Sequence, residues 1–253
     1  MKRRFRIVGD EGFYGDYDGQ CERGVRVDFV PHGYGVCKLS NGSIYRGGWA
    51  DGVFEGKGMI THLDGSSYEG DYKRGRCHGR GVARTPETDT VGKVCYEGGF
   101  VDGTWEGRGT RVEEDTVRNG RLVRYGSTLT GVWVRGELHG RGVRTSTHGL
   151  KYAGEFKAGL FHGDGMLYGK IPDRVSSTFT SPVTKLRGRF EEHTFVEGTI
   201  TFENGDTYKG TFGSNGLVGG GYCTGTGTYT EANGDAVGMY FGADGTFRGY
   251  WAE

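Results

Sequence analysis

The sequence predicts an all-β fold, an elongated antiparallel single-layer sheet that forms a solenoid-like stack of β-hairpins. Two observations carry this prediction. First, a glycine followed two residues later by an aromatic residue recurs ten times, at intervals that include clean units of 23 residues. Second, glycine accounts for 52 of the 253 residues, whereas only four prolines occur and no Gly-X-Y register is present. A short recurring unit is typical of an array in which each unit contacts its neighbours.

The recurring glycines and aromatic residues predict a packed aromatic ladder. The ten glycines are Gly15, Gly47, Gly70, Gly98, Gly131, Gly154, Gly188, Gly210, Gly238 and Gly249. Residues i and i+2 of a strand share a face, so an aromatic ring is expected to lie over bare glycine backbone on a neighbouring strand. The ladder is predicted to contain Tyr17, Trp49, Tyr72, Phe100, Trp133, Phe156, Phe190, Phe212 and Tyr240.

Further glycines predict the second strand and the turn of each hairpin. Gly56 and Gly58 follow Gly47 by nine and eleven residues, and the same offsets recur along the chain. Gly52 and its equivalents lie where a tight turn is needed, and polar-Gly pairs such as Asn41-Gly42 are suited to connect successive hairpins. We therefore expect about nine hairpins over residues 13–253, after an N-terminal segment of residues 1–12.

Four segments are longer than the repeat requires. They lie near residues 18–31, 85–94, 113–128 and 169–185, and they contain all four prolines of the chain. Insertions in repeat arrays often project from one side and serve binding. We expect these segments to be loops that leave the sheet.

Charge and cysteine content limit the classes of partner. Lys and Arg balance Asp and Glu at 32 each, so no broad field favours nucleic acid or a membrane surface, and neither is expected as a partner. No apolar run has the length of a membrane span. The five cysteines include no C-x-x-C pair and are interpreted as reduced thiols of a cytoplasmic protein.

Residues that could carry chemistry do not combine into a site. His32, His78, His139 and His162 each precede a second-strand glycine, so they are expected on separate hairpins, roughly 10 Å apart, too far for one zinc ion. Cys77 and His78 are adjacent in a predicted strand and should point to opposite faces. The sequence therefore predicts no enzyme, no catalytic residue, no metal site and no cofactor.

The last aromatic residues form a separate candidate site. Phe247, Tyr250 and Trp251 follow the final repeat, where no later hairpin is available to cover the aromatic face. Exposed apolar patches usually mark interfaces. We expect these residues to contact another subunit or a second copy of the chain.

Several runs closely resemble the MORN repeat. They are Tyr45-Arg-Gly-Gly-Trp-Ala-Asp-Gly-Val-Phe-Glu-Gly-Lys-Gly, Tyr68-Glu-Gly-Asp-Tyr-Lys-Arg-Gly-Arg-Cys-His-Gly-Arg-Gly and Tyr152-Ala-Gly-Glu-Phe-Lys-Ala-Gly-Leu-Phe-His-Gly-Asp-Gly. The resemblance extends from Phe13 to Trp251, with departures in the units that begin at Leu186 and Ala236.

The resemblance implies a non-enzymatic scaffold or protein-interaction subunit. Simple MORN arrays are common in cytoskeletal assemblies, including flagellar axonemes and radial-spoke heads, so the implied partners are other protein subunits of a large intracellular complex. Two other classes remain open. One is a peripheral phospholipid-binding module, which would need basic residues from several hairpins on one face. The other is a regulatory subunit that orients a catalytic partner.

Overall fold

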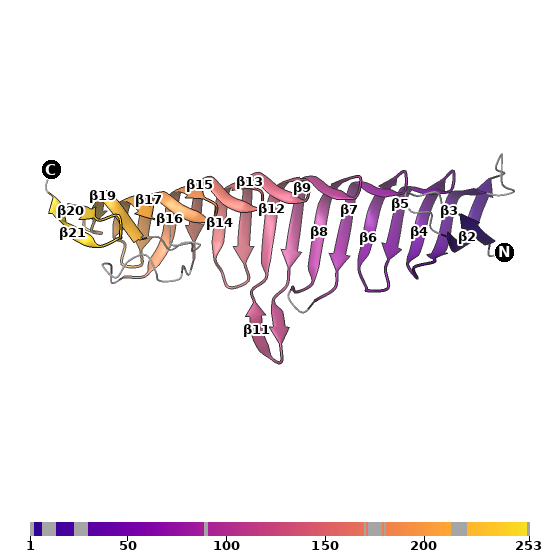
Figure 1. Cartoon of the computed structure of the whole chain (residues 1–253), viewed down its shortest axis with the longest axis horizontal. Helices are drawn as coiled ribbons and strands as arrows, with labels where there is room; N and C mark the ends of the chain where they lie inside the picture. Colours follow the sequence, from indigo (N-terminus) through magenta and orange to yellow (C-terminus); the bar gives the residue numbers. More distant parts are fainter. Residues whose placement is uncertain are drawn as a thin grey trace. The chain divides into compact units, whose positions relative to one another are not determined.

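The computed structural model describes residues 3–6, 14–22, 30–88, 91–169, 171, 179, 181–213 and 222–251. These residues form strands and their connections, without a helix, in two compact units. One unit comprises residues 1–126 and 133–136, and the other comprises residues 127–132 and 137–253. Strands that follow one another in sequence pair antiparallel within each unit, apart from β10 and β11, which pair with each other in a separate small sheet (Figure 1). The predicted all-β architecture of stacked antiparallel hairpins is confirmed.

The first unit contains eleven of the strands described for the chain. They are β1 (Arg3–Arg6), β2 (Tyr14–Glu22), β3 (Val30–Leu39), β4 (Ile44–Ala50), β5 (Val53–Thr61), β6 (Ser67–Lys73), β7 (Arg76–Thr85), β8 (Val94–Val101), β9 (Thr104–Glu113), β10 (Thr116–Arg118) and β11 (Arg121–Arg124). β12 (Ser127–Val134) contributes residues to both units.

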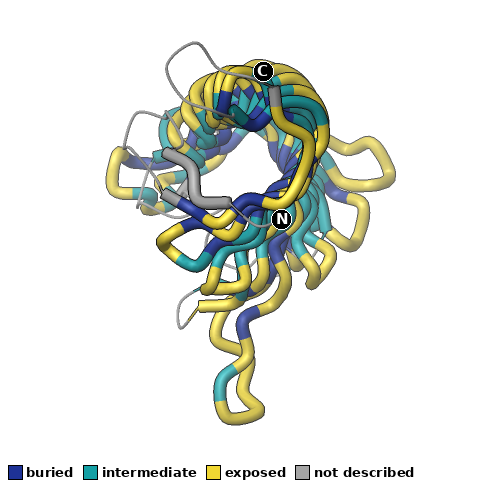
Figure 2. The backbone as a smooth tube through the Cα atoms, turned by 90° about the vertical axis from the view of Figure 1, so that its right-hand side faces the viewer, coloured by how far each residue is buried: buried dark blue, intermediate teal, exposed yellow. Residues whose placement is uncertain are grey.

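The second unit continues the same pattern of hairpins. Its strands are β13 (Glu137–Ser146), β14 (Lys151–Lys157), β15 (Leu160–Tyr168), β16 (Val183–Glu191), β17 (Thr194–Phe202), β18 (Thr207–Gly213), β19 (Tyr222–Thr230), β20 (Ala236–Phe241) and β21 (Phe247–Trp251). In both units the turns are largely exposed, whereas buried residues concentrate within the strands (Figure 2).

A row of glycines crosses the strands of each unit, because each of the strands β2 to β9 and β13 to β18 places a glycine opposite a glycine of its neighbour. In the first unit the row contains Gly19, Gly35, Gly47, Gly58, Gly70, Gly81, Gly98 and Gly109. In the second unit it contains Gly142, Gly154, Gly165, Gly188, Gly198 and Gly210.

Tyrosine rings lie directly on all of these glycines except Gly142, Gly188 and Gly198. A Cβ added to Gly81 would come within 2.5 Å of the Tyr68 hydroxyl, and one added to Gly47 would come within 2.5 Å of the Gly58 Cα. The hydroxyls of Tyr68, Tyr45 and Tyr152 each donate a hydrogen bond to the carbonyl three residues ahead, at 2.8 Å for Tyr68 and at 2.9 Å for the other two. The predicted packing of rings on glycine backbone is confirmed.

Other aromatic residues enclose each tyrosine. Tyr152 stacks on Phe161 with ring centroids 3.8 Å apart, and its edge meets Phe156 and Phe190 at 5.2 and 5.1 Å. Tyr45 and Tyr96 have the same kind of stacking partner. Burial raises the pKa of Tyr152 to about 12, so the hydroxyl stays protonated and keeps its donor role at neutral pH. Edge-to-face and offset-stacked ring pairs of this kind each add about 1 kcal/mol beyond area burial.

Two kinds of turn connect the strands. Within hairpins, Asp51-Gly52 and its equivalents have positive φ at both positions, 49° and 81°, which is the type I′ turn that matches strand twist. Between hairpins, an Asn or Asp side chain closes the turn, as Asn41 Oδ1 does by accepting the Ser43 N–H at 3.0 Å. The sequence predicted both connections correctly.

The N-terminal part of the first unit differs from the expected boundaries. The segment near 18–31 is not simply a loop, because β2 continues to Glu22 and places Gly19 in the glycine row opposite Gly35. Gly15 is therefore not the first glycine of the row. Tyr17 lies on the glycine pair Gly19 and Gly35, in the way that Tyr45 lies on its own glycine pair. Arg3–Arg6 of the predicted N-terminal segment pairs with β2 as strand β1. Residues 23–29 of the expected loop lie outside the described residues.

The other insertions adopt three different structures. Residues 86–88 and 91–93 form a connection between β7 and β8, as expected. The segment near 113–128 contains a second small sheet, the β10–β11 hairpin. In the segment near 169–185, Ile171 is buried and Phe179 contacts Phe202 and Tyr208, with ring centroids 4.9 and 5.5 Å apart. At these two positions the segment packs on the aromatic core rather than leaving it.

Replacing Gly81 by alanine tests the ring-on-glycine packing. We expect Gly81→Ala to lower the free energy of unfolding by roughly 3 kcal/mol, because the new methyl group overlaps the Tyr68 ring. Gly75→Ala in the turn of the same hairpin is the matched control. It meets no atom within 4 Å but has a φ of +82°, so it should cost roughly 1–2 kcal/mol. Urea denaturation of both variants provides the comparison, and a smaller loss for Gly81→Ala would contradict the packing.

Candidate functional site

The structure places eight of the nine predicted ladder residues in the buried aromatic core. Tyr17, Trp49, Tyr72, Phe100, Trp133, Phe156, Phe190 and Phe212 are all at most 6% exposed. Tyr240 is the exception, at 48% exposed, and its prediction is wrong. In β20 the side-chain alternation is shifted by one residue, because Gly227 lies opposite Met239 rather than Gly238. Met239 and Phe241 therefore face the core.

The three predicted interface residues lie on β21, and their role remains a prediction. Phe247 is half-buried and packs against Phe241, with ring centroids 5.6 Å apart. Tyr250 is 68% exposed and contacts Phe247. The side chain of Trp251 lies outside the described residues. An exposed tyrosine beside a half-buried phenylalanine is suited to a contact with another molecule.

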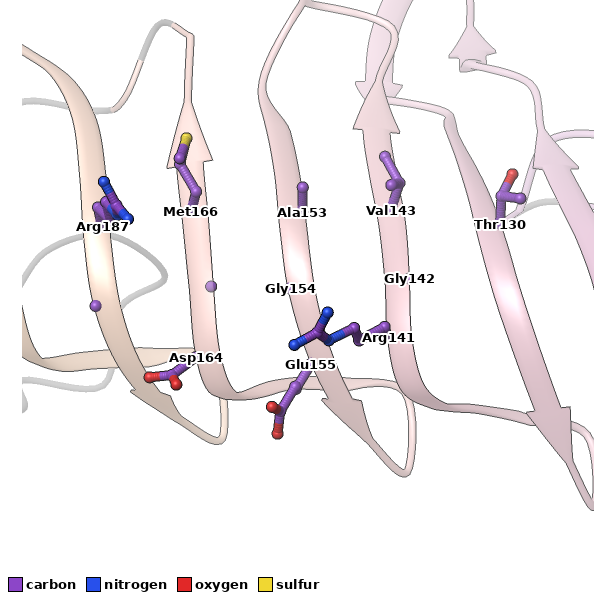
Figure 3. A pocket seen from close by; sticks show the side chains of 12 residues that line it. Thr130, Arg141, Gly142, Val143, Ala153, Gly154, Glu155, Asp164, Met166 and Arg187 are labelled. Atoms are coloured by element: carbon purple, nitrogen blue, oxygen red, sulfur yellow. The ribbon is translucent and has the colours of Figure 1, made fainter.

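A groove of about 800 Å³ crosses β13 to β16 of the second unit. Its floor includes the backbone of Gly142, Gly154, Gly165 and Gly188, whose opposite side carries the aromatic core. Two rows of side chains border the floor (Figure 3). One row is Thr130, Val143, Ala153, Met166 and Arg187, and the other is Arg141, Glu155 and Asp164.

The groove combines charges of both signs with small apolar side chains. Arg141 and Asp164 are exposed at one border, and Arg187 is exposed at the other. Val143 and Met166 are half-buried in the same row as Arg187. This surface can accept an extended chain that offers both acidic and basic side chains, but it has no single-sign field for a polyanion.

The same face of the first unit has a comparable charge pattern. Lys57 and Asp71 occupy neighbouring strands, and their side chains form an ion pair at 2.6 Å. Asp71 also accepts the Arg80 N–H at 2.9 Å, and its pKa is lowered by the hydrogen bond from Lys57. Opposite charges on adjacent strands therefore offset one another along this face.

A polar side chain on each of three hairpins binds the turn of the next hairpin, which the sequence analysis did not predict. Glu55 accepts the Arg74 N–H at 2.9 Å, and Glu106 accepts the Arg135 N–H at 3.0 Å. His139 does the same for Ala158 at 3.3 Å. The signal was present in the sequence, because an acceptor side chain directly precedes the first glycine of the second strand in each case.

The residues that the sequence analysis considered as metal ligands or catalytic groups lie on the strands of the hairpins. His32, His78, His139 and His162 lie on β3, β7, β13 and β15. Burial raises the pKa of the Cys77 thiol to about 11, which keeps it in the less nucleophilic protonated form. Over the described ranges, no three His, Cys, Asp or Glu side chains converge to hold a metal ion. Nor does any helix there have the length and hydrophobicity of a membrane span.

Replacing Glu106 tests the hydrogen bond between successive hairpins. We expect Glu106→Ala to speed hydrogen exchange of the Arg135 amide about tenfold, because that N–H loses its acceptor. Glu97→Ala, at an exposed position on neighbouring β8, is the control and should leave the Arg135 amide unchanged. Equal protection of Arg135 in both variants would show that the Glu106 carboxylate does not hold the turn.

Comparison with known families identifies the repeat. A family model for the MORN repeat matches six segments, residues 30–44, 45–67, 68–87, 96–112, 130–150 and 152–170. No match was found among curated protein sequences. MORN repeats generally serve as modules for interaction with proteins or membranes and are not known as an enzyme family. Four of the six matched segments, 45–67, 68–87, 96–112 and 152–170, contain a tyrosine that lies on paired glycines, and the chain is therefore a MORN-repeat protein.

Proposed function

We propose that this MORN-repeat protein is a non-enzymatic scaffold subunit of a large intracellular assembly, cytoskeletal or axonemal and of the radial-spoke type. The observation that carries the proposal is the open face opposite the aromatic core. In the second unit that face forms a groove over four strands, bordered by Arg141, Glu155, Asp164 and Arg187. A long surface with fixed side-chain rows suits simultaneous contacts with neighbouring subunits.

The charge pattern favours a protein partner over a phospholipid surface. A lipid-binding face would need basic residues from several hairpins in one row. Lys57 is instead paired with Asp71, and Arg141 shares its row with Glu155 and Asp164. Mixed charges give specificity for a partner with a complementary pattern, and they weaken attraction to an anionic membrane.

The β21 residues supply a second contact in this proposal. Tyr250 and Phe247 form an aromatic pair at 4.9 Å, with Tyr250 largely exposed. Tyrosine is enriched at interface centres, where its ring is buried and its hydroxyl remains hydrogen-bonded. This pair is therefore proposed to bind another subunit or a second copy of the chain.

Proximity labelling and imaging of a tagged full-length chain test the proposed function. We expect labelled neighbours to be cytoskeletal or axonemal proteins and the tag to follow those structures. Charge reversal of the groove by Arg141→Glu with Arg187→Glu should lower that labelling about tenfold, because rows of complementary charge are broken.

Lys157→Glu is the matched control, since Lys157 is exposed in the same unit but does not line the groove. It should label the same neighbours as the unmodified chain. A diffuse distribution of the unmodified chain would refute the cytoskeletal assignment. Equal labelling by the groove variant and the control would refute the role of the groove.

A further inference from the structure

The β10–β11 hairpin is the most apolar exposed part of the first unit. Together with the residues that flank it, it has five of the fourteen large hydrophobic side chains that are substantially exposed in the described part of the chain: Val112, Val117, Leu122, Val123 and Tyr125. They fall within 14 consecutive residues. The hairpin forms a two-stranded sheet of its own and extends away from β8 and β9 (Figure 1).

The base of the hairpin is fixed by a buried carboxylate. Glu113 has a side chain only 1% exposed, and it forms ion pairs with Arg111 at 2.9 Å and with Arg124 of β11. The Asp115 carboxylate accepts the N–H of Gly126, in the connection from β11 to β12, at 2.6 Å. These contacts hold both ends of the projection in one position.

The tip is braced by the neighbouring connection between β7 and β8. Arg118 forms an ion pair with Glu87 at 2.7 Å and also donates to the Thr88 carbonyl. At the base, the Glu114 N–H donates to the Lys93 carbonyl at 2.9 Å. A surface held in a fixed position loses less conformational freedom on binding, which favours a binding role.

The β10–β11 hairpin carries an excess of positive charge. Arg118 lies directly opposite Arg121 in the pairing register, an arrangement of like charges that is unfavourable. Glu87 offsets Arg118, whereas Arg121 has no carboxylate partner among the described residues. Residues 116–125 contain three arginines and no acidic residue.

Apolar residues occur on the same strand as the uncompensated charge. Val117 and Leu122 face each other across the hairpin, and Val123 follows at 59% exposed. In the described structure β11 pairs with β10 on one side and with no strand on the other. An unpaired edge of this kind can accept an added strand through backbone hydrogen bonds.

We propose that the β11 edge binds an extended segment of a partner protein in which acidic and apolar residues alternate. The added strand pairs with Arg121–Arg124, its carboxylates lie on the face of Arg121, and its apolar side chains pack on Leu122 on the opposite face. The inference rests on the proposed scaffold function and specifies one of its contacts. Glu87, Glu114 and Asp115 surround the hairpin and disfavour an anionic membrane as the occupant.

Selection from a displayed library of random twelve-residue peptides tests the proposal, with the purified full-length chain as bait. We expect the enriched peptides to alternate Glu or Asp with Val, Ile, Leu or aromatic residues. Each selected peptide is then synthesised, and its affinity is measured by fluorescence anisotropy at low and physiological salt. Arg121→Glu and Leu122→Asp should each weaken binding at least about tenfold, and the effect of Arg121→Glu should shrink at higher salt.

Matched controls separate the hairpin from general surface effects. Lys73→Glu reverses an exposed charge on β6, and Val101→Asp replaces a valine on β8 that is 46% exposed, close to the 44% of Leu122. Both controls should bind the peptides as the unmodified chain does. Circular dichroism and the thermal midpoint verify folding of every variant.

Three outcomes would overturn the proposal. The first is a library that yields no binder or yields basic peptides. The second is that the selected peptides bind the Arg121→Glu and Leu122→Asp variants as tightly as they bind the controls. The third is binding to vesicles of phosphatidylcholine with phosphatidylserine that depends on Arg121, because it would make a membrane the occupant. None of these outcomes alters the groove comparison in cells, so failure here is distinct from failure of the scaffold function.

Discussion

The fold depends on the contact between a tyrosine ring and the bare backbone of two paired glycines. Tyr68 lies over Gly70 and Gly81 so closely that a methyl group on either glycine would overlap the ring. Its hydroxyl reaches the Asp71 carbonyl only because the ring lies flat along its own strand. The contact therefore fixes strand register, since a slip of one residue would place a side chain under the ring.

This constraint also explains how the two faces of the sheet divide their roles. The aromatic side chains on one face pack against one another, as Tyr152, Phe156 and Phe161 do, and supply the buried area. The opposite face is left with rows of polar side chains such as Arg141 and Glu155, which stability does not require to be apolar. Evolution can vary those rows and the projecting β10–β11 hairpin without disturbing the core, which suits a scaffold.

The sequence predicted the repeat, the turns and eight ladder residues because each follows from a local rule of strand geometry. The prediction from sequence was wrong where a shift in strand register changed which residue of a strand joins the glycine row or faces the core. Gly19 rather than Gly15 enters the glycine row, and Tyr240 points away from the core because Met239 faces Gly227. The groove and the turn contacts of Glu106 depend on which strands become neighbours, so a reading of single hairpins missed them. The hairpin at 113–128 was predicted as an insertion, but its bracing by Glu87 is a long-range contact.

The most direct test of the central contact is the chemical shift of the glycine Hα protons measured by nuclear magnetic resonance. A proton beneath an aromatic ring is shifted upfield by the ring current. The account predicts upfield Hα shifts for Gly58, Gly81, Gly109 and Gly165, beyond those of Gly65 and Gly103, which have no neighbouring group within 4 Å at the Cβ position. Shifts for all six glycines within the range of the two turn glycines would contradict it.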